Sequence, residues 1–332
     1  MNIKNIIRKC VFYCLNEHQV DFFYKIYYKV FYKNEMRKKV ELGNLNSDKI
    51  FYVIRPREDC VEGLLSLFWN VVRNIDYALE NKYIPVVDFQ NYKTQYFQDE
   101  NENSWEYYFT QPNDYPLNEI YNSKNVILSG LESQWYKKEK YKACYDAHSL
   151  KILHQEIFNS IDFSDEVKSR VKKEICELNI DLRNTIGLYL RGTDYIKLKP
   201  SGHPVQPNVE QAISVVDKFL KKYNLSKIFL VTEDGEIYDA IKKKYGENCI
   251  TPRYDRYIYD YDGKKFLSKD ASINDLADTA YERGMRYLIK MIILSKCNYL
   301  IGGNTNGMWA VNVFAENEFK DKYIFELGVY GK

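Results

Sequence analysis

Arg191, Thr193 and Asp194 stand together in the stretch GLYLRGTDY (187–195), directly after an apolar run. A guanidinium that leaves a buried strand can bind an anion through paired, charge-assisted hydrogen bonds. Gly192 gives the chain the freedom to turn at this point. The alternative is a local ion pair between Arg191 and Asp194, with no ligand involved.

Two further polar loops follow predicted strands. TEDGE (232–236) comes after KIFLVT (227–232), and GGNTNG (302–307) comes after NYLIGG (298–303). Ligands of open parallel sheets bind outside the carboxyl ends of the strands, so we expect the three loops to converge at one edge. GGNTNG also opens a predicted helix, whose N-terminus favours an anion such as phosphate. The three loops together favour a nucleotide-type ligand over simple turns.

The elements that must position these loops alternate between strands and helices. This alternation predicts an α/β fold with two Rossmann-like domains and a cleft between them. We expect a basic amphipathic helical segment at 1–47, an N-terminal domain at 48–180 and a C-terminal domain at 181–332. The predicted strands are 49–55, 83–90, 125–130, 185–190, 227–232, 298–303 and 322–327, and the predicted helices are 63–82, 146–178, 207–223, 234–246, 279–297 and 305–315.

Composition excludes several classes. The net charge of +2 over 332 residues gives no strong field for nucleic acid. Seven scattered cysteines without a CxxC pair argue against a disulfide framework and a structural zinc site, and favour the cytoplasm. No apolar run has the length of a signal peptide or a membrane span. The basic residues 1–40 either pack on the protein or lie on an anionic membrane surface.

The order of these motifs resembles the fucosyltransferase superfamily of GT-B glycosyltransferases, in particular the α-1,6- and α-1,2-fucosyltransferases and the protein O-fucosyltransferases. YLRGTD is similar to their strand ending in His-x-Arg-Arg, and GHP (202–204) to the His-Pro pair of the α-1,6 enzymes. LVTEDGE resembles their Ala-Thr-Asp-Asp strand end, and residues 282–315 resemble their last helix–strand–helix with its phosphate loop. The resemblance covers roughly residues 185–316, and more weakly 49–130.

The resemblance implies a GT-B-like fold, with the domain 48–180 on the acceptor side and the domain 181–332 on the donor side. It also implies inverting transfer of fucose from GDP-fucose without a metal or other cofactor. Arg191 is then expected to bind the β-phosphate and stabilise the departing diphosphate. Four family positions differ: the His is Tyr189, the second Arg is Gly192, the acidic residue on the late helix is Lys290 and the catalytic Glu is Lys199. Because Tyr189 and Lys290 replace residues that resemble guanine readers, Lys290 is expected to donate to the guanine carbonyl oxygen. A transferase with another nucleotide sugar is the alternative.

An inverting transfer needs a base within hydrogen-bond reach of the acceptor hydroxyl. Asp194, Glu62 and the Glu233–Asp234 pair are candidates, and Asp194 is alternatively structural, holding Arg191. His203 is the only histidine near these loops and is either a site residue or a turn residue. The expected catalytic residues are therefore Arg191, Asp194 and Glu62, and the expected donor-binding residues are Tyr189, Gly192, Thr193, His203, Thr232, Glu233, Asp234, Lys290, Asn304, Thr305, Asn306 and Gly307.

Two rival hypotheses stay open. Asp260 and Asp262 form a D-x-D, which GT-A glycosyltransferases use to hold a divalent cation on the diphosphate. Because this one lies in a Tyr/Asp/Lys-rich loop late in the chain, we interpret it as a solvated loop and expect no metal site. The second rival is a non-catalytic nucleotide or glycan binder on the same fold. The expected partners of a transferase are a nucleotide sugar and a glycan acceptor, lipid-linked if residues 1–40 contact the inner face of the membrane.

Overall fold

The computed structural model describes residues 36–57, 62–130, 147–264, 266–267 and 279–331. The chain folds into two compact units that interleave along the sequence. The first holds Met1–Cys60, Asn70–Asp88 and Pro112–Tyr141, and the second holds Val61–Trp69, Phe89–Gln111 and Lys142–Lys332. The helical residues up to 178, predicted within the N-terminal domain 48–180, thus lie in the second unit.

The first unit contains a four-stranded sheet of order β1-β4-β2-β3. Its strands β2, β3 and β4 run parallel and confirm the strands predicted at 49–55, 83–90 and 125–130. The unit also contains the end of α3 and the short helix α4. The bounds are β1 Lys38–Val40, β2 Phe51–Ile54, α3 Leu64–Glu80, β3 Ile84–Val87, α4 Leu117–Ile120 and β4 Val126–Leu128.

Strand β1 differs from the expectation of a helical segment over 1–47. Residues 1–35 of that segment lie outside the described residues, and Lys38–Val40 form an edge strand antiparallel to β4. Lys38 and Lys39 are exposed. Lysines on an edge strand are a common protection against pairing with another chain, and the same basic residues are what made the segment look like a helix with a charged face.

The second unit contains a five-stranded, fully parallel sheet of order β7-β6-β5-β8-β9. In chain order this is 3-2-1-4-5, the arrangement of a doubly wound sheet, and its switch point lies between β5 and β8. The strand bounds are β5 Thr185–Tyr189, β6 Lys227–Val231, β7 Cys249–Ile250, β8 Tyr299–Gly303 and β9 Asp321–Phe325.

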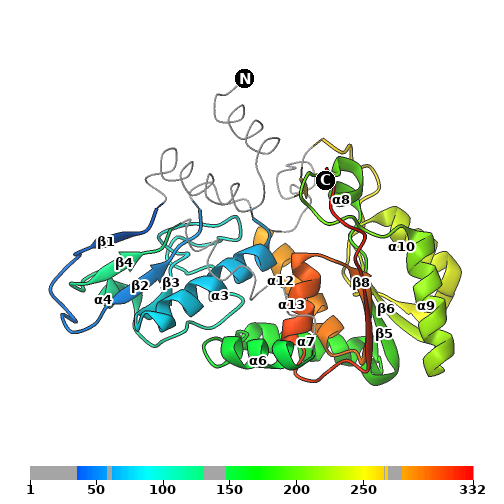
Figure 1. Ribbon diagram of the computed structural model, residues 1–332, viewed down its shortest axis with the longest axis horizontal. Coiled ribbons are helices and arrows are strands. Elements are labelled where there is room, and N and C mark those ends of the chain that lie inside the picture. The colour runs from blue at the N-terminus through cyan, green and yellow to red at the C-terminus, as the bar shows by residue number, and fades with distance from the viewer. Residues whose placement is uncertain (1–35, 58–61, 131–146, 265, 268–278, 332) are drawn as a thin grey trace. The chain divides into compact units, whose positions relative to one another are not determined.

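Helices cover both faces of this sheet (Figure 1). Helices α9 and α10 pack on one face, while α12 and α13 cover the other, with α7 against α12 and α6 against α13. The helix bounds are α6 Ala147–Phe158, α7 Asp165–Leu178, η3 Leu182–Asn184, α8 Thr193–Leu198, α9 Val209–Tyr223, α10 Gly235–Tyr245, η4 Gly246–Asn248, α12 Ala280–Ser295 and α13 Asn306–Phe314. Among the described residues, none of the helices has the length and apolarity needed to span a bilayer.

Capping residues set the ends of several predicted helices. Asn208 and Gln211 form a capping box at the start of α9: the side-chain oxygen of each residue accepts a hydrogen bond from the backbone N–H of the other. The single helical stretch predicted over 146–178 is two helices, because the Ser164 side chain accepts a hydrogen bond from Val167 N and starts α7 afresh. The predicted α/β fold class is confirmed, and the caps show why the boundaries fall where they do.

Candidate functional site

The carboxyl ends of β5 and β8 define the candidate site. The chain after β5 leads to helices on one face of the sheet, and the chain after β8 leads to α13 on the other. At such a switch point the connections diverge and leave a crevice where ligands of doubly wound sheets bind. Arg191 lies two residues beyond β5, and residues 304–307 follow β8 directly. The predicted convergence of these two loops at one sheet edge is confirmed by the strand order.

Arg191 lies between two carboxylates. Its Nη2 donates to Asp194 Oδ1 at 3.0 Å, and its Nε lies 3.4 Å from Glu233 Oε1. Burial lowers the pKa of Arg191, but the adjacent Glu233 and Asp194 outweigh this and raise that pKa well above its ordinary value. The guanidinium is therefore permanently charged, and the side chain keeps 23% of its surface exposed. The local ion pair predicted as an alternative exists.

The loop after β6 holds the loop after β5. Glu233 Oε1 accepts from Gly192 N at 3.0 Å and from Thr193 Oγ1 at 2.9 Å, and Asp234 Oδ2 accepts from Thr193 N at 2.8 Å. Thr193 has φ of +40°, which is unfavourable for a β-branched residue. These three hydrogen bonds hold Thr193 in that conformation.

Asp234 also begins helix α10. Its Oδ1 accepts from Glu236 N and Ile237 N as an N-cap, and Thr232 Oγ1 accepts from Asp234 N at 3.2 Å. The predicted donor-binding residues Thr232, Glu233 and Asp234 therefore have protein partners that fix the position of Arg191. The structure brings them together with Gly192, Thr193 and Asp194 in one cluster.

We predict that Gly192→Ala destabilises this cluster. A Cβ at residue 192 would lie 2.3–2.6 Å from the Asp234 carboxylate, which cannot withdraw without losing its bond to Thr193 N. Overpacking of this kind typically costs about 1–3 kcal/mol. Denaturant unfolding of Gly192→Ala measures the loss. Gly63→Ala is the matched control, because a Cβ there meets nothing within 4 Å. Equal stability of both variants would contradict the prediction.

The N-terminus of α13 faces the same crevice. Thr305 is its N-cap and accepts from Met308 N at 3.1 Å, which leaves the N–H groups of the first helical residues, Asn306 and Gly307, without intrahelical partners. A Cβ at residue 307 would lie 2.6 Å from the Tyr287 hydroxyl and 3.0 Å from that of Tyr189. Only glycine fits there, because the two tyrosine hydroxyls approach the backbone closely. The unpartnered N–H groups at the helix N-terminus are what would favour an anion.

Neighbouring side chains fix this loop. Asn304 accepts from Gln206 Nε2 through its carbonyl oxygen and from Trp309 Nε1 through Oδ1. Asn306 accepts from Trp69 Nε1 at 3.1 Å and donates to Ser66 Oγ at 3.1 Å, both on the first turns of α3. These hydrogen bonds hold the loop after β8 in place, and donors held in place are what electrostatic stabilisation of a charged group requires.

The remaining predicted residues lie around this centre. Tyr189, at the end of β5, has its hydroxyl 3.3 Å from that of Tyr287. The His203 ring contacts those of Tyr195 and Phe266, and burial lowers its pKa, with Arg191 lowering it further against the opposing effect of Asp194. Neutral imidazole is thus the form expected near pH 7. Glu62 precedes α3, and its carbonyl oxygen accepts from Gln95 Nε2 at 2.8 Å, outside the Arg191 cluster.

Lys290 has a partner that sequence analysis missed. Its Nζ donates at 2.8 Å to Oδ1 of Asp255, which lies in the loop after β7. Tyr287 was missed as well, although it lies one helical turn before Lys290 and its spacing on the predicted helix could have indicated a shared face. Asp255 carried no such signal, because it lies in an irregular stretch of tyrosines and charged residues.

The predicted D-x-D lies on an exposed loop. Asp260 and Asp262 are exposed, and Asp262 pairs with Lys264 at 3.2 Å. Over the described ranges, no group of three His, Cys, Asp or Glu side chains is arranged to hold a metal ion. These observations fit the interpretation of residues 260–262 as a solvated loop, and metal independence stays a prediction.

Comparison with solved structures identifies the fold. The NodZ α-1,6-fucosyltransferase soaked with GDP-fucose matches with a TM-score of 0.50 and 16% identity, over 86% of this chain and 98% of that chain. The chain shares the fold of this fucosyltransferase. Another NodZ structure, from Bradyrhizobium, matches with a TM-score of 0.47 and 17% identity over 86% and 97% of the two chains. A point mutant of Arabidopsis thaliana FUT1 in complex with GDP matches with a TM-score of 0.42 and 11% identity over 85% of this chain and 72% of that chain.

No protein-family model and no curated protein sequence matches the chain. The likeness to the solved fucosyltransferase confirms the predicted resemblance at the level of the GT-B-like fold. At 16% identity that likeness speaks for the fold alone, and substrate chemistry has to be argued from the side chains of the site.

Proposed function

We propose that the protein is an inverting glycosyltransferase that transfers fucose from GDP-fucose to a glycan acceptor. The observation that carries the proposal is the placement of Arg191 and the α13 N-terminus at the same switch point, after β5 and β8. A guanidinium and a helix N-terminus that flank one crevice suit a diphosphate. Fucose and GDP are carried over, as part of the proposal, from the fucosyltransferase soaked with GDP-fucose whose fold the chain shares.

Arg191 would act on the leaving group. As the bond between the sugar and the diphosphate breaks, negative charge develops on the diphosphate, and fixed donors stabilise that charge without reorganising. Asp194 and Glu233 hold the guanidinium from one side, so its remaining N–H groups have a set direction. The backbone N–H groups of Asn306 and Gly307 would donate from the other side of the crevice.

The acceptor hydroxyl needs a proton acceptor. Asp194 is 2% exposed, and its oxygens accept from Arg191 and from Leu267 N. We therefore assign Asp194 to positioning Arg191 rather than to proton transfer. Glu233 and Asp234, the other candidates, accept hydrogen bonds from Gly192 and Thr193 and hold the loop of Arg191. We therefore propose Glu62, whose half-buried side chain lies just before α3, for that role.

The test is nucleoside diphosphate release from a panel of nucleotide sugars, with and without glycan acceptors. For an inverting enzyme we expect acceptor-dependent GDP release from GDP-fucose. NMR of the product should show that the anomeric configuration of the transferred fucose is opposite to that in the donor. Release from UDP- or CDP-sugars instead would keep a transferase and overturn fucose. Binding without release for every donor and acceptor would favour a non-catalytic binder.

We predict that activity survives removal of divalent cations. The exposed Asp260 and Asp262 are not part of the proposed diphosphate site, whose charge is balanced by Arg191 and a helix N-terminus. Turnover with EDTA should equal turnover with Mn²⁺, and Asp260→Asn combined with Asp262→Asn should be mild. Loss of activity in EDTA that Mn²⁺ restores would favour the metal-dependent alternative.

The acceptor and the cellular location complete the proposal. A cytoplasmic enzyme that builds a bacterial surface polysaccharide, peripheral to the inner face of the membrane through residues 1–40, fits the basic N-terminal sequence. Sedimentation with anionic vesicles tests the membrane contact. Binding that is lost when residues 1–35 are deleted would support it, and equal sedimentation of both forms would remove it.

A further inference from the structure

Gln206 is a buried amide that joins two loops of the second unit. The residue is 5% exposed. Its Nε2 donates to the carbonyl oxygens of Pro204 and Asn304, each at 3.1 Å. Pro204 lies in the segment between α8 and α9, whereas Asn304 begins the loop that leads into α13. One side chain thus links two segments that are far apart in the sequence, since Gln206 and Asn304 are separated by 98 positions.

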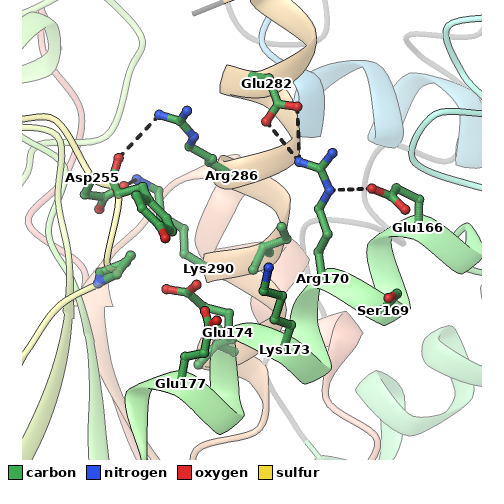
Figure 2. Close-up of a pocket in the computed structure, with 14 residues that line it drawn as sticks. Glu166, Ser169, Arg170, Lys173, Glu174, Glu177, Asp255, Glu282, Arg286 and Lys290 are labelled. Atoms are coloured by element: carbon green, nitrogen blue, oxygen red, sulfur yellow. Dashed lines mark hydrogen bonds and ion pairs between the residues drawn. The ribbon is translucent and has the colours of Figure 1, made fainter.

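Other polar side chains of this unit join neighbouring helices away from the candidate site. Figure 2 shows a cavity of about 580 Å³ between α7, α12 and the loop after β7, where Arg170 pairs with Glu166 on its own helix and with Glu282 on α12. None of the described residues that line this cavity belongs to the Arg191 cluster or to the loop after β8. Gln206 differs from them, because each loop that it joins leads to one half of the proposed diphosphate site.

The Pro204 side of the link leads to Arg191 through aromatic rings. His203 directly precedes Pro204, and its ring centroid lies 5.4 Å from that of Tyr195. The Arg191 guanidinium lies over the Tyr195 ring, with Cζ at 5.1 Å from the ring centroid, a distance at which a cation and a ring attract each other. The position of residues 203–204 therefore affects how Arg191 is packed.

The Asn304 side of the link leads to the N-terminus of α13. Asn304 directly precedes Thr305, the N-cap of that helix. Its backbone carbonyl accepts from Gln206, and its Oδ1 accepts from Trp309 Nε1 at 3.0 Å. A shift of Asn304 would move the first turn of α13, whose backbone N–H groups are proposed to donate to the diphosphate.

The segment that contains Pro204 has backbone partners of its own. Residues 202–205 make three backbone hydrogen bonds of 2.8–2.9 Å to residues 328–330, and Pro204 forms an antiparallel bridge with Val329. These bonds hold the segment independently of the Gln206 side chain. The contribution specific to the amide is therefore the link to Asn304.

The acceptor end of the amide makes no such contribution. Oε1 of Gln206 is buried and accepts no hydrogen bond within the described part of the chain. A buried polar atom without a partner is uncommon and costs stability. Oε1 lies against Gly303, the last residue of β8, where a Cβ would overlap with it. Stability alone thus gives a poor account of an amide at this position, and the two bonds from Nε2 give a better one.

We propose that Gln206 is a positioning residue that holds the two halves of the diphosphate site, Arg191 and the N-terminus of α13, in a fixed relation. This inference rests on the proposed function and adds to it the side chain that ties the halves together. A diphosphate between them accepts hydrogen bonds from both sides. Donors held in place stabilise its developing charge better than donors that must first move. Without the link each half stays folded, but the two can shift relative to each other.

Calorimetry with GDP and kinetics with GDP-fucose test the proposal on Gln206→Met, which keeps the length of the side chain and removes its donors. GDP affinity should fall roughly 10-fold, the effect of losing one or two hydrogen bonds, and kcat should fall with it. Asn74→Leu is the matched control, because Asn74 is a buried amide of the first unit that donates to Asn70 O at 2.8 Å. It should lower the stability to unfolding and leave GDP affinity unchanged. Equal weakening of GDP binding by Asn74→Leu would assign the effect to general destabilisation and overturn the proposal.

Gly303→Ala provides a second variant that keeps the amide and displaces it. The added Cβ occupies the place of Oε1, and the end of a flexible side chain can move away at little cost in stability. Its bonds to Pro204 and Asn304 are then lost. We expect Gly303→Ala to unfold near the wild-type denaturant concentration and to bind GDP as weakly as Gln206→Met. Wild-type GDP affinity in Gly303→Ala would contradict the proposed role.

A double-mutant cycle separates positioning from a merely structural role. If the amide acts by holding Arg191 in relation to α13, Gln206→Met should weaken GDP binding by no more than about 2-fold in the Arg191→Lys background, where the planar contact is already lost. Full additivity of the two changes, or wild-type GDP affinity in a folded Gln206→Met, overturns the assignment and leaves the proposed transferase standing. Failure of the wild type to bind GDP, UDP and CDP overturns the proposed function itself.

Discussion

Replacement of Arg191 by alanine should lower kcat by about 10²–10³-fold, the usual cost of losing one fixed donor to a developing charge. The guanidinium is the one cation recorded between Asp194 and Glu233 in the described cluster, and it lies at the β5 end of the crevice. Arg191→Lys should be almost as poor, because an ammonium cannot make the planar two-point contact. Steady-state kinetics at saturating donor measure the effect.

The exposed Arg183, at the opposite end of β5, provides the control. Arg183→Ala removes the same charge from η3, just before the strand, and should leave kcat unchanged. Circular dichroism should confirm that the Arg191 variants are folded. Near-normal turnover of Arg191→Lys would remove Arg191 from stabilisation of the leaving group.

Asp234→Ala should destabilise the protein by about 2–4 kcal/mol, because it removes an N-cap and leaves the buried Thr193 N–H without an acceptor. The carboxylate makes both contacts: Oδ1 caps α10, and Oδ2 accepts from Thr193 N at 2.8 Å. Asp234→Asn should cost less, since its single carbonyl oxygen can keep the cap but not both contacts. Guanidinium unfolding of the two variants separates the two contributions.

Asp181 offers a comparison, because it caps the short helix η3 on the surface and accepts from Arg183 N at 3.0 Å. Asp181→Ala loses a cap without burying an unsatisfied group, so its loss should stay near the lower end, about 0.5–2 kcal/mol. If Asp234→Ala cost no more than Asp181→Ala, the bond to Thr193 would contribute nothing to stability.

Periodicity predicted most of the elements because burial dictates it locally. The strand predicted at 185–190 and the helix predicted at 279–297 are β5 and α12, to within two residues at each end. The short helix α8 was missed, because its first residue, Thr193, has a positive φ that hydrogen bonds from a distant loop impose. Local sequence carries no record of such a partner.

The site was predictable where it follows from strand order and not where it depends on side-chain pairing. Arg191 and Gly307 could be placed, since the ends of parallel strands meet at one edge. That Glu233 would hold the loop of Arg191, and that Lys290 would meet Asp255, could not be predicted. Both depend on how an irregular loop after β7 settles beside its neighbours.

The strand order also has a consequence for how the protein folds. Ile186 of β5 pairs with Tyr299 of β8, the pairing in this sheet that joins residues furthest apart in the chain. Closing so long a loop costs entropy that nearer pairings do not pay. The chain can therefore form β5, β6 and α9 early, while the crevice between β5 and β8 waits for the last strands. A nascent chain that ends before residue 299 can hold Arg191 beside Glu233 and still have no binding site.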